Sequence, residues 1–77
     1  MYKVLIAEDE LLTRAGIVSS VNWAELNMQI VAQADDGIQA LQLYRTHYPE
    51  IVVTDLNMPR LGGVELIGKI CEEERPC

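Results

Sequence analysis

The chain has 77 residues, enough for one small domain, and 49% of them are hydrophobic, which supports a packed core and excludes general disorder. The formal net charge of −6 argues against a nucleic-acid or anionic-membrane surface, because both favour clusters of Lys and Arg. No apolar stretch approaches the ~20 residues that span a bilayer, and the N-terminus lacks a signal-peptide layout. Two cysteines, Cys71 and Cys77, are expected to be reduced thiols. We therefore expect a cytoplasmic location.

Hydrophobic patterning predicts alternating strands and helices along the chain. The expected elements are strand 3–7, helix 10–20, loop 21–27, strand 29–34, a helix capped at 35–37 and stopped before Pro49, strand 50–54, and helix 63–74. Apolar side chains at helical spacing are expected to face the core: Leu11, Ala15 and Val18, then Ile38, Leu41 and Tyr44, then Val64, Ile67 and either Ile70 or Cys71.

This order predicts an α/β fold with a parallel sheet. If the second strand lies on one side of the first and the third on the other, the first strand is central and the strand order is 2-1-3; right-handed crossovers then decide which face each helix covers. Under the same rule the first helix covers one face of the sheet, and the second and third helices cover the other. The turn after the first strand becomes the topological switch point, where open α/β sheets bind ligands.

Acidic residues follow two of these strands. Glu8, Asp9 and Glu10 come after the first strand, and Asp55 comes after the third. Single acidic residues after strands are usually solvated loop positions, but several carboxylates at one sheet edge repel one another unless a cation balances them. Mg²⁺ suits such oxygen ligands. Asp9 and Asp55 would supply carboxylates, Asn57 a backbone carbonyl, and Glu8 either a direct contact or one through water.

Several motifs together resemble the receiver domain of two-component response regulators, which has a flavodoxin-like fold. The matching features are Glu8-Asp9 after the first strand, Ala34-x-x-Gly37 followed by Ala40-Leu41, and Asp55-x-x-Met58-Pro59-x-x-x-Gly63 after an apolar strand. The resemblance covers essentially all 77 residues. The stretch Asn22-Trp23-Ala24-Glu25-Leu26 resembles receivers that are fused to AraC-type DNA-binding domains.

The resemblance implies a role for each matching residue. Asp55 would be the phosphoacceptor that takes a phosphoryl group from the phosphohistidine of a sensor histidine kinase. Glu8 and Asp9 would match the acidic pair that holds Mg²⁺, and Asn57 the backbone ligand. The module would not itself be an enzyme. It would regulate transcription in a longer parent through a C-terminal DNA-binding domain, while residues 1–77 contact neither nucleic acid nor membrane.

Receivers of this family continue with two more strands and helices, which carry a switch Thr or Ser and a Lys. Residues 1–77 are therefore expected to form a partial receiver domain that lacks strands 4–5 and helices 4–5, so phosphorylation would lose two of its usual donors. The third strand would then be an edge with an apolar run at 51–53, which favours self-association.

Two alternatives remain open on the sequence. A truncated receiver can act only in interaction or assembly, without phosphotransfer. The other alternative is a metal-dependent phosphatase with an aspartyl nucleophile. Such enzymes generally carry a second Asp two residues after the nucleophile, where this chain has Asn57.

Overall fold

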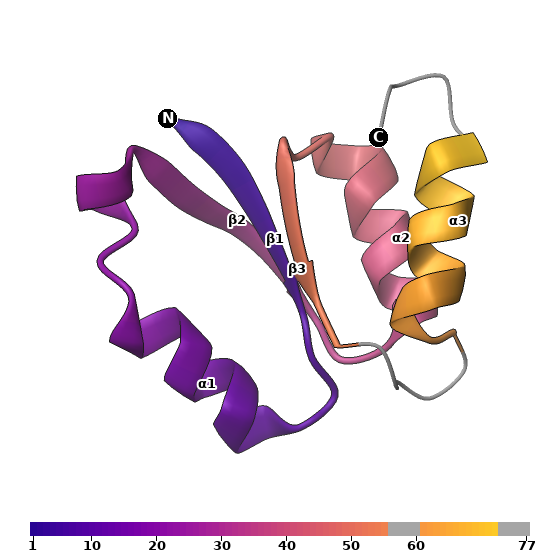
Figure 1. Ribbon diagram of the computed structural model, residues 1–77, viewed down its shortest axis with the longest axis horizontal. Helices are drawn as coiled ribbons and strands as arrows, with labels where there is room; N and C mark the ends of the chain where they lie inside the picture. Colours follow the sequence, from indigo (N-terminus) through magenta and orange to yellow (C-terminus); the bar gives the residue numbers. More distant parts are fainter. Residues whose placement is uncertain (56–60, 73–77) are drawn as a thin grey trace.

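The computed structural model describes residues 1–55 and 61–72. Its elements are β1 (Tyr2–Ala7), α1 (Leu11–Ser20), a short 3₁₀ helix η1 (Ala24–Leu26), β2 (Met28–Ala34), α2 (Gly37–His47), β3 (Ile51–Thr54) and α3 (Gly63–Glu72), as Figure 1 shows. The bounds lie within a residue or two of the predicted ones. The predicted loop 21–27 contains η1, and the predicted end of the last helix at Glu74 lies outside the described residues.

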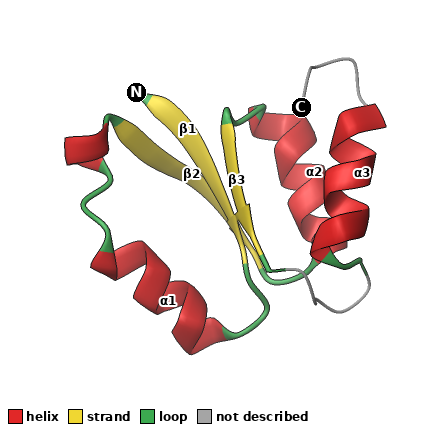
Figure 2. Ribbon diagram, in the orientation of Figure 1, coloured by secondary structure: helices red, strands yellow, loops and turns green. Residues whose placement is uncertain are grey.

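The three strands form one parallel sheet in the order β2-β1-β3, as predicted (Figure 2). Ala7, the last residue of β1, pairs with Ala34 of β2 and with Thr54 of β3. All three strands therefore end at the same level. The residues that follow them are brought to one edge of the sheet.

The helices lie on both faces of the sheet, as predicted (Figure 1). α1 lies on one side, and α2 and α3 lie together on the other. The main hydrophobic core fills the space between the sheet and the α2/α3 side; its buried members are Leu5, Ala7, Ala34, Ala40, Leu41, Tyr44, Leu61, Leu66 and Ile70. Because side chains alternate along a strand, Val4 and Ile6, which are also fully buried, face the α1 side.

The inward face of α3 differs from the predicted one. Val64 is 68% exposed and Ile67 is 47% exposed, whereas Leu66, which was not predicted to face inward, is fully buried. Ile70, one of the two residues predicted to complete the inward face, is buried as expected. Val64 and Ile67 are three residues apart, and so are Gly63 and Leu66. Helical periodicity therefore cannot decide which of these two neighbouring lines of residues faces the core. Packing against α2 selects the second line. In α2 itself, Leu41 and Tyr44 are buried as predicted, while Ile38 is 40% exposed.

The predicted core face of α1 is also wrong. No residue of α1, a helix that the structure describes in full, is buried. Leu11 is 63% exposed and Ala15 is exposed, while Ile17 and Val18 are half-buried. The helix thus covers its side of the sheet only loosely.

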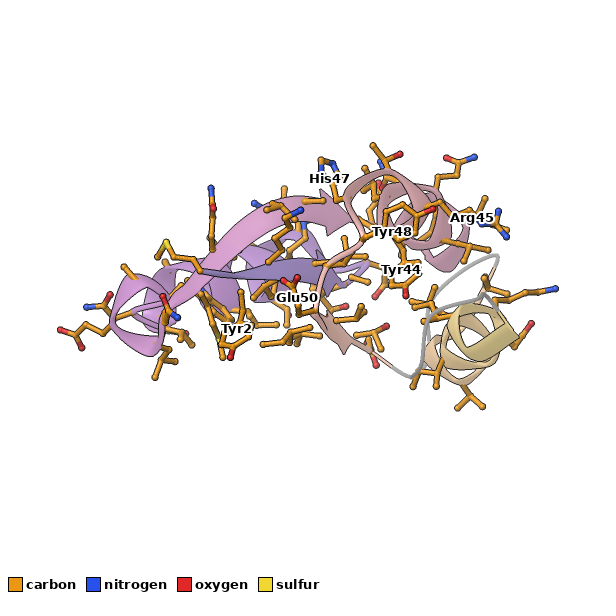
Figure 3. All side chains as sticks on the ribbon, turned by 90° about the horizontal axis from the view of Figure 1, so that it is seen from above. Tyr2, Tyr44, Arg45, His47, Tyr48 and Glu50 are labelled. Carbon is orange, nitrogen blue, oxygen red and sulfur yellow. The ribbon has the colours of Figure 1, made fainter. Side chains whose placement is uncertain are left out.

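At the opposite edge of the sheet, the α2–β3 turn is tied to the start of β1. The backbone N–H of Lys3 donates to Glu50 Oε1 at 2.6 Å, and the Glu50 N–H donates to the Lys3 carbonyl at 3.0 Å. Tyr44 and Tyr48 pack edge to face, with their ring centroids 6.1 Å apart (Figure 3). These contacts fix the register of β3 beside β1, and so also the position of the other end of β3.

Candidate functional site

Two backbone hydrogen bonds position the acidic residues at the carboxyl edge of the sheet. Beyond the end of β1, the Glu8 N–H donates to the Ala34 carbonyl of β2 at 3.0 Å. Beyond the end of β3, the Asp55 N–H donates to the Ala7 carbonyl of β1 at 3.1 Å. Both bonds extend the ladder of the sheet, so the backbone at Glu8 and Asp55 is held by the same hydrogen bonding as the strands.

The carboxylates of Glu8, Asp9 and Asp55 meet at this edge. One oxygen from each lies within 4.8 Å of the other two. Glu8 is buried, with 8% of its surface exposed, Asp55 is half-buried and Asp9 is exposed. The site is thus a cluster with one buried wall and one side open to solvent.

The remaining residues of the acidic turn and loop have different positions. Glu10 lies outside the cluster: its carboxylate caps α1 by accepting the Leu12 N–H at 3.1 Å. Asn57, which the sequence predicts as a backbone ligand, lies outside the described residues. Asp36, a second buried carboxylate, caps α2 by accepting the Gln39 N–H at 2.7 Å, which confirms the predicted cap.

Burial raises the pKa of Glu8 above its ordinary value, because the charged form loses hydration. The Glu10 N–H, which donates to Glu8 Oε2 at 3.3 Å, acts in the opposite direction and lowers the pKa. A hydrogen bond to Asp9 and the negative charges of Asp55 and Asp9 raise it further. The cluster therefore disfavours full ionisation until positive charge is supplied.

The donor set fits a hard divalent cation. All three groups offer carboxylate oxygens, which Mg²⁺ and Ca²⁺ prefer, and none offers the thiolate or imidazole typical of zinc sites. Mg²⁺ usually takes one or two carboxylates and completes its shell with water and phosphate oxygens. An open side lined by Asp9 and Asp55 leaves room for those further ligands.

Reasoning from the sequence did not identify Arg14 as part of this region. Its Nη1 donates to the Glu8 carbonyl at 2.7 Å, and the side chain is half-buried. The only sequence signal was a basic residue in the second turn of a helix that follows an acidic turn. Such residues are common on solvated helix faces, so the pattern alone did not single it out.

The chain beyond Asp55 returns to the described residues at Leu61, against the N-terminus of α2. Leu61 is 7% exposed. A methyl group added at Gly37 would overlap the Leu61 backbone and lie 2.5 Å from its Cβ. Gly37 therefore permits the close approach of α2 to the residues that follow the acidic site.

Among the described residues, every helix is too short or too polar to cross a membrane.

A three-stranded parallel sheet with helices on both faces and an acidic cluster at its switch point defines a flavodoxin-like α/β signalling module. The family model of the response regulator receiver domain matches residues 4–77, and the chain belongs to this family. It is therefore a receiver segment of a two-component system.

Relatives and solved structures agree with this assignment. The transcriptional regulatory protein HptR of Staphylococcus aureus is 40% identical over 70 residues, which make up 91% of this chain and 28% of that protein. The receiver domain of AraT, a response regulator from Geobacillus stearothermophilus, superimposes with a TM-score of 0.92 at 42% identity, over 99% of this chain and 59% of that one. A two-component transcriptional regulator AraC from Clostridium phytofermentans gives a TM-score of 0.85 at 42% identity, over 94% of this chain and 58% of that one. The chain thus spans less than a third of the curated relative and about three fifths of the two solved chains.

Proposed function

We propose that this chain is a phosphoacceptor module in which Asp55 receives a phosphoryl group from the phosphohistidine of a sensor histidine kinase. The proposal rests on one observation above all: Glu8, Asp9 and Asp55, from two separate strand ends, hold carboxylate oxygens within 4.8 Å of one another. Asp55 is half-buried and lies on the open side of this cluster, so a large phosphodonor can reach it. Asp55 is accordingly the acceptor. Glu8, Asp9 and Asp55 would hold the cation, together with the Asn57 carbonyl that the sequence predicts as a ligand.

The chemistry follows from these positions. An oxygen of the Asp55 carboxylate forms a bond to phosphorus while the bond from phosphorus to the kinase imidazole breaks, and the electron pair stays on the imidazole nitrogen. A carboxylate is a weak nucleophile, so orientation and charge neutralisation must supply most of the acceleration. The ladder bond from the Asp55 N–H to Ala7 holds the backbone of the acceptor in place. Mg²⁺ would neutralise charge on the acceptor and on the incoming phosphate.

The wider setting of the module is also part of the proposal. The first three βα units of a receiver would act within a longer cytoplasmic transcription regulator, whose C-terminal AraC-type domain contacts DNA. Two similar proteins support this setting: HptR is a transcriptional regulatory protein, and the Clostridium phytofermentans protein is a two-component transcriptional regulator AraC. The module itself is not an enzyme in this account. Its partner is the kinase, and residues 1–77 contact no nucleic acid.

One observation favours a second function, assembly without phosphotransfer. β3 pairs with β1 on one side, and no strand pairs with its other side among residues 1–55 and 61–72. Its residues, Ile51–Thr54, are apolar apart from the last and are all half-buried. Such an edge can pair with the β3 of a second copy. In that case light scattering would report a dimer or a larger assembly.

Labelling with radioactive acetyl phosphate tests the phosphoacceptor role. Wild-type protein should take up label only with Mg²⁺, and hydroxylamine should release it, as it does from acyl phosphates. Asp55→Asn should take up none, while Asp35→Asn, which removes an exposed carboxylate from the turn before α2, should behave like wild type. Labelling of Asp55→Asn would refute the assignment. Unlabelled but assembled wild-type protein would favour the second function.

A further inference from the structure

The acidic turn between β1 and α1 needs something to hold it in place. It carries Glu8 and Asp9, two of the three carboxylates in the cluster. The helix that follows it, α1, buries none of its residues, so side-chain packing anchors it only weakly. The bond from the Glu8 N–H to Ala34 fixes the start of the turn. Without a further restraint, the part of the turn that carries Asp9, together with α1, would be free to move relative to Asp55.

Arg14 provides a direct restraint. Its guanidinium Nη1 donates to the Glu8 carbonyl at 2.7 Å, a short distance typical of charge-assisted bonds. The Arg14 backbone N–H also donates to the Glu10 carbonyl at 2.9 Å within the helix. The backbone bond would be made by any residue other than proline at this position, so the side-chain bond to the Glu8 carbonyl is what arginine adds, and it connects α1 to the end of β1.

The other hydrogen bonds of the turn show why the bond from Arg14 to the Glu8 carbonyl matters for cation binding. The Glu10 N–H donates to Glu8 Oε2 at 3.3 Å, so the turn is closed partly through a carboxylate that a metal ion would draw away. The Arg14 bond goes to a backbone carbonyl instead. It can persist when the Glu8 carboxylate turns toward the cation, and it directs the guanidinium to the backbone rather than to the carboxylate oxygens.

We propose that Arg14 is a positioning residue for the cation site: it holds the Glu8–Asp9 turn beside Asp55 through the Glu8 carbonyl. This role deepens the proposed function and rests on it, because it presumes that the cluster binds Mg²⁺. Residues that orient metal ligands from outside the coordination shell commonly change metal affinity by ~10–100-fold when they are replaced.

Isothermal titration with Mg²⁺ alone tests the role without any phosphotransfer. Arg14→Met keeps an unbranched side chain but removes the donor, and it should bind Mg²⁺ about 10-fold more weakly than wild type. Arg45→Met is the matched control, because it removes the same charge from the last turn of α2, and α2 ends at the opposite edge of the sheet (Figure 1). It should leave the dissociation constant within about twofold of wild type.

The outcomes separate positioning from two simpler roles. An arginine that only stabilises α1 would lower the melting temperature of Arg14→Met in EDTA while leaving the Mg²⁺ affinity of the folded protein unchanged. An arginine that acts only by its charge would weaken Mg²⁺ binding in the wild type, so its removal would tighten binding. Unchanged or tighter binding by folded Arg14→Met therefore overturns the proposal.

Further variants keep the test decisive if Arg14→Met does not fold by circular dichroism. Arg14→Lys retains the charge without the planar guanidinium, and Arg14→Gln retains one N–H donor without the charge. Both should bind Mg²⁺ more weakly than wild type, and wild-type affinity in both would overturn the role. If wild type itself fails to bind Mg²⁺, and Asp9→Asn therefore changes nothing, the proposed function fails as well. Normal wild-type binding with an unaffected Arg14 series removes only the positioning role.

Discussion

Replacing Glu8 by Gln should stabilise the cation-free protein at neutral pH. Glu8 is buried, and its carboxylate lies within 4.8 Å of the carboxylates of Asp9 and Asp55. In the absence of a cation its charge is opposed both by lost hydration and by two like charges. Gln has nearly the same shape and still offers an oxygen to the Glu10 N–H, so the variant removes the charge and little else.

The size of the effect follows from these distances. Two unit charges within 4.8 Å repel by at least ~0.9 kcal/mol, the value at the dielectric constant of water, which is the lower limit for a cluster with Asp9 exposed and Asp55 half-exposed. Two such pairs give ~1.7 kcal/mol, from which we subtract ~0.5–1 kcal/mol for the weaker bond of the Glu10 N–H to a neutral oxygen. The net stabilisation is about 1 kcal/mol, equivalent to a rise of ~4–8 °C in Tm for a domain of this size.

The pH dependence has a definite sign. The pKa of Glu8 is higher in the folded state than its ordinary value of 4.5, so the folded protein binds the proton more tightly than the unfolded chain does. The stability that this tighter proton binding contributes to the folded state is fully present below pH 4.5 and is lost as the pH rises through the folded-state pKa of Glu8. The advantage of Glu8→Gln should therefore vanish at pH 4, grow as the pH rises, and level off above the folded-state pKa.

Thermal unfolding followed by circular dichroism, in EDTA from pH 4 to pH 8, measures this dependence. Glu25→Gln, which removes an exposed carboxylate in η1, is the matched control and should leave Tm unchanged at every pH. With saturating Mg²⁺, wild type should gain more stability than Glu8→Gln. A lower Tm for Glu8→Gln at pH 7 in EDTA, or an equal difference at pH 4 and pH 7, would refute the electrostatic reasoning.

Two paired substitutions test the packing that supports the site. Gly37→Ala should lower stability in urea unfolding by ~1–3 kcal/mol because its methyl meets the Leu61 backbone, whereas Gly68→Ala, with open space around it, should raise stability by ~0.5–1 kcal/mol. Leu66→Ala, at a fully buried position of α3, should cost ~2–5 kcal/mol, and Val64→Ala, at a position 68% exposed, less than ~0.5 kcal/mol. Equal effects within either pair would contradict the packing described.

Much of the fold could be predicted because its rules act on short segments and on chirality. The strands are continuous apolar runs, the helix between Asp36 and His47 has a recognisable cap, and, once the order 2-1-3 is assumed, right-handed crossovers fix the face that each helix covers. The convergence of Glu8, Asp9 and Asp55 follows from that order, since parallel strands bring their carboxyl ends to one edge. The cluster was therefore predictable without any knowledge of side-chain packing.

What the sequence could not supply depends on tertiary contacts. The choice between Val64/Ile67 and Leu66/Ile70 as the buried stripe of α3 depends on how α3 meets α2, and both stripes are apolar. The bond from Arg14 to the Glu8 carbonyl depends on the angle at which α1 leaves the sheet. Periodicity predicts neither the packing of α3 on α2 nor the angle of α1, because it fixes the spacing of residues along one helix but not the rotation of that helix against its neighbour.

The same cluster that suits a cation also links cation binding to folding. The three carboxylate pairs among Glu8, Asp9 and Asp55 repel by ~2.6 kcal/mol in total, and backbone bonds at the ends of β1 and β3 keep the groups together. A ligand at 100 times its dissociation constant stabilises the folded state by ~2.7 kcal/mol, about as much as this repulsion costs. Because α1 buries none of its residues, its own packing adds little to the stability of this region. Occupancy of the acidic site should therefore govern how firmly the whole β1–α1 region is folded, and a cation at this edge would act as a structural element as well as a chemical one.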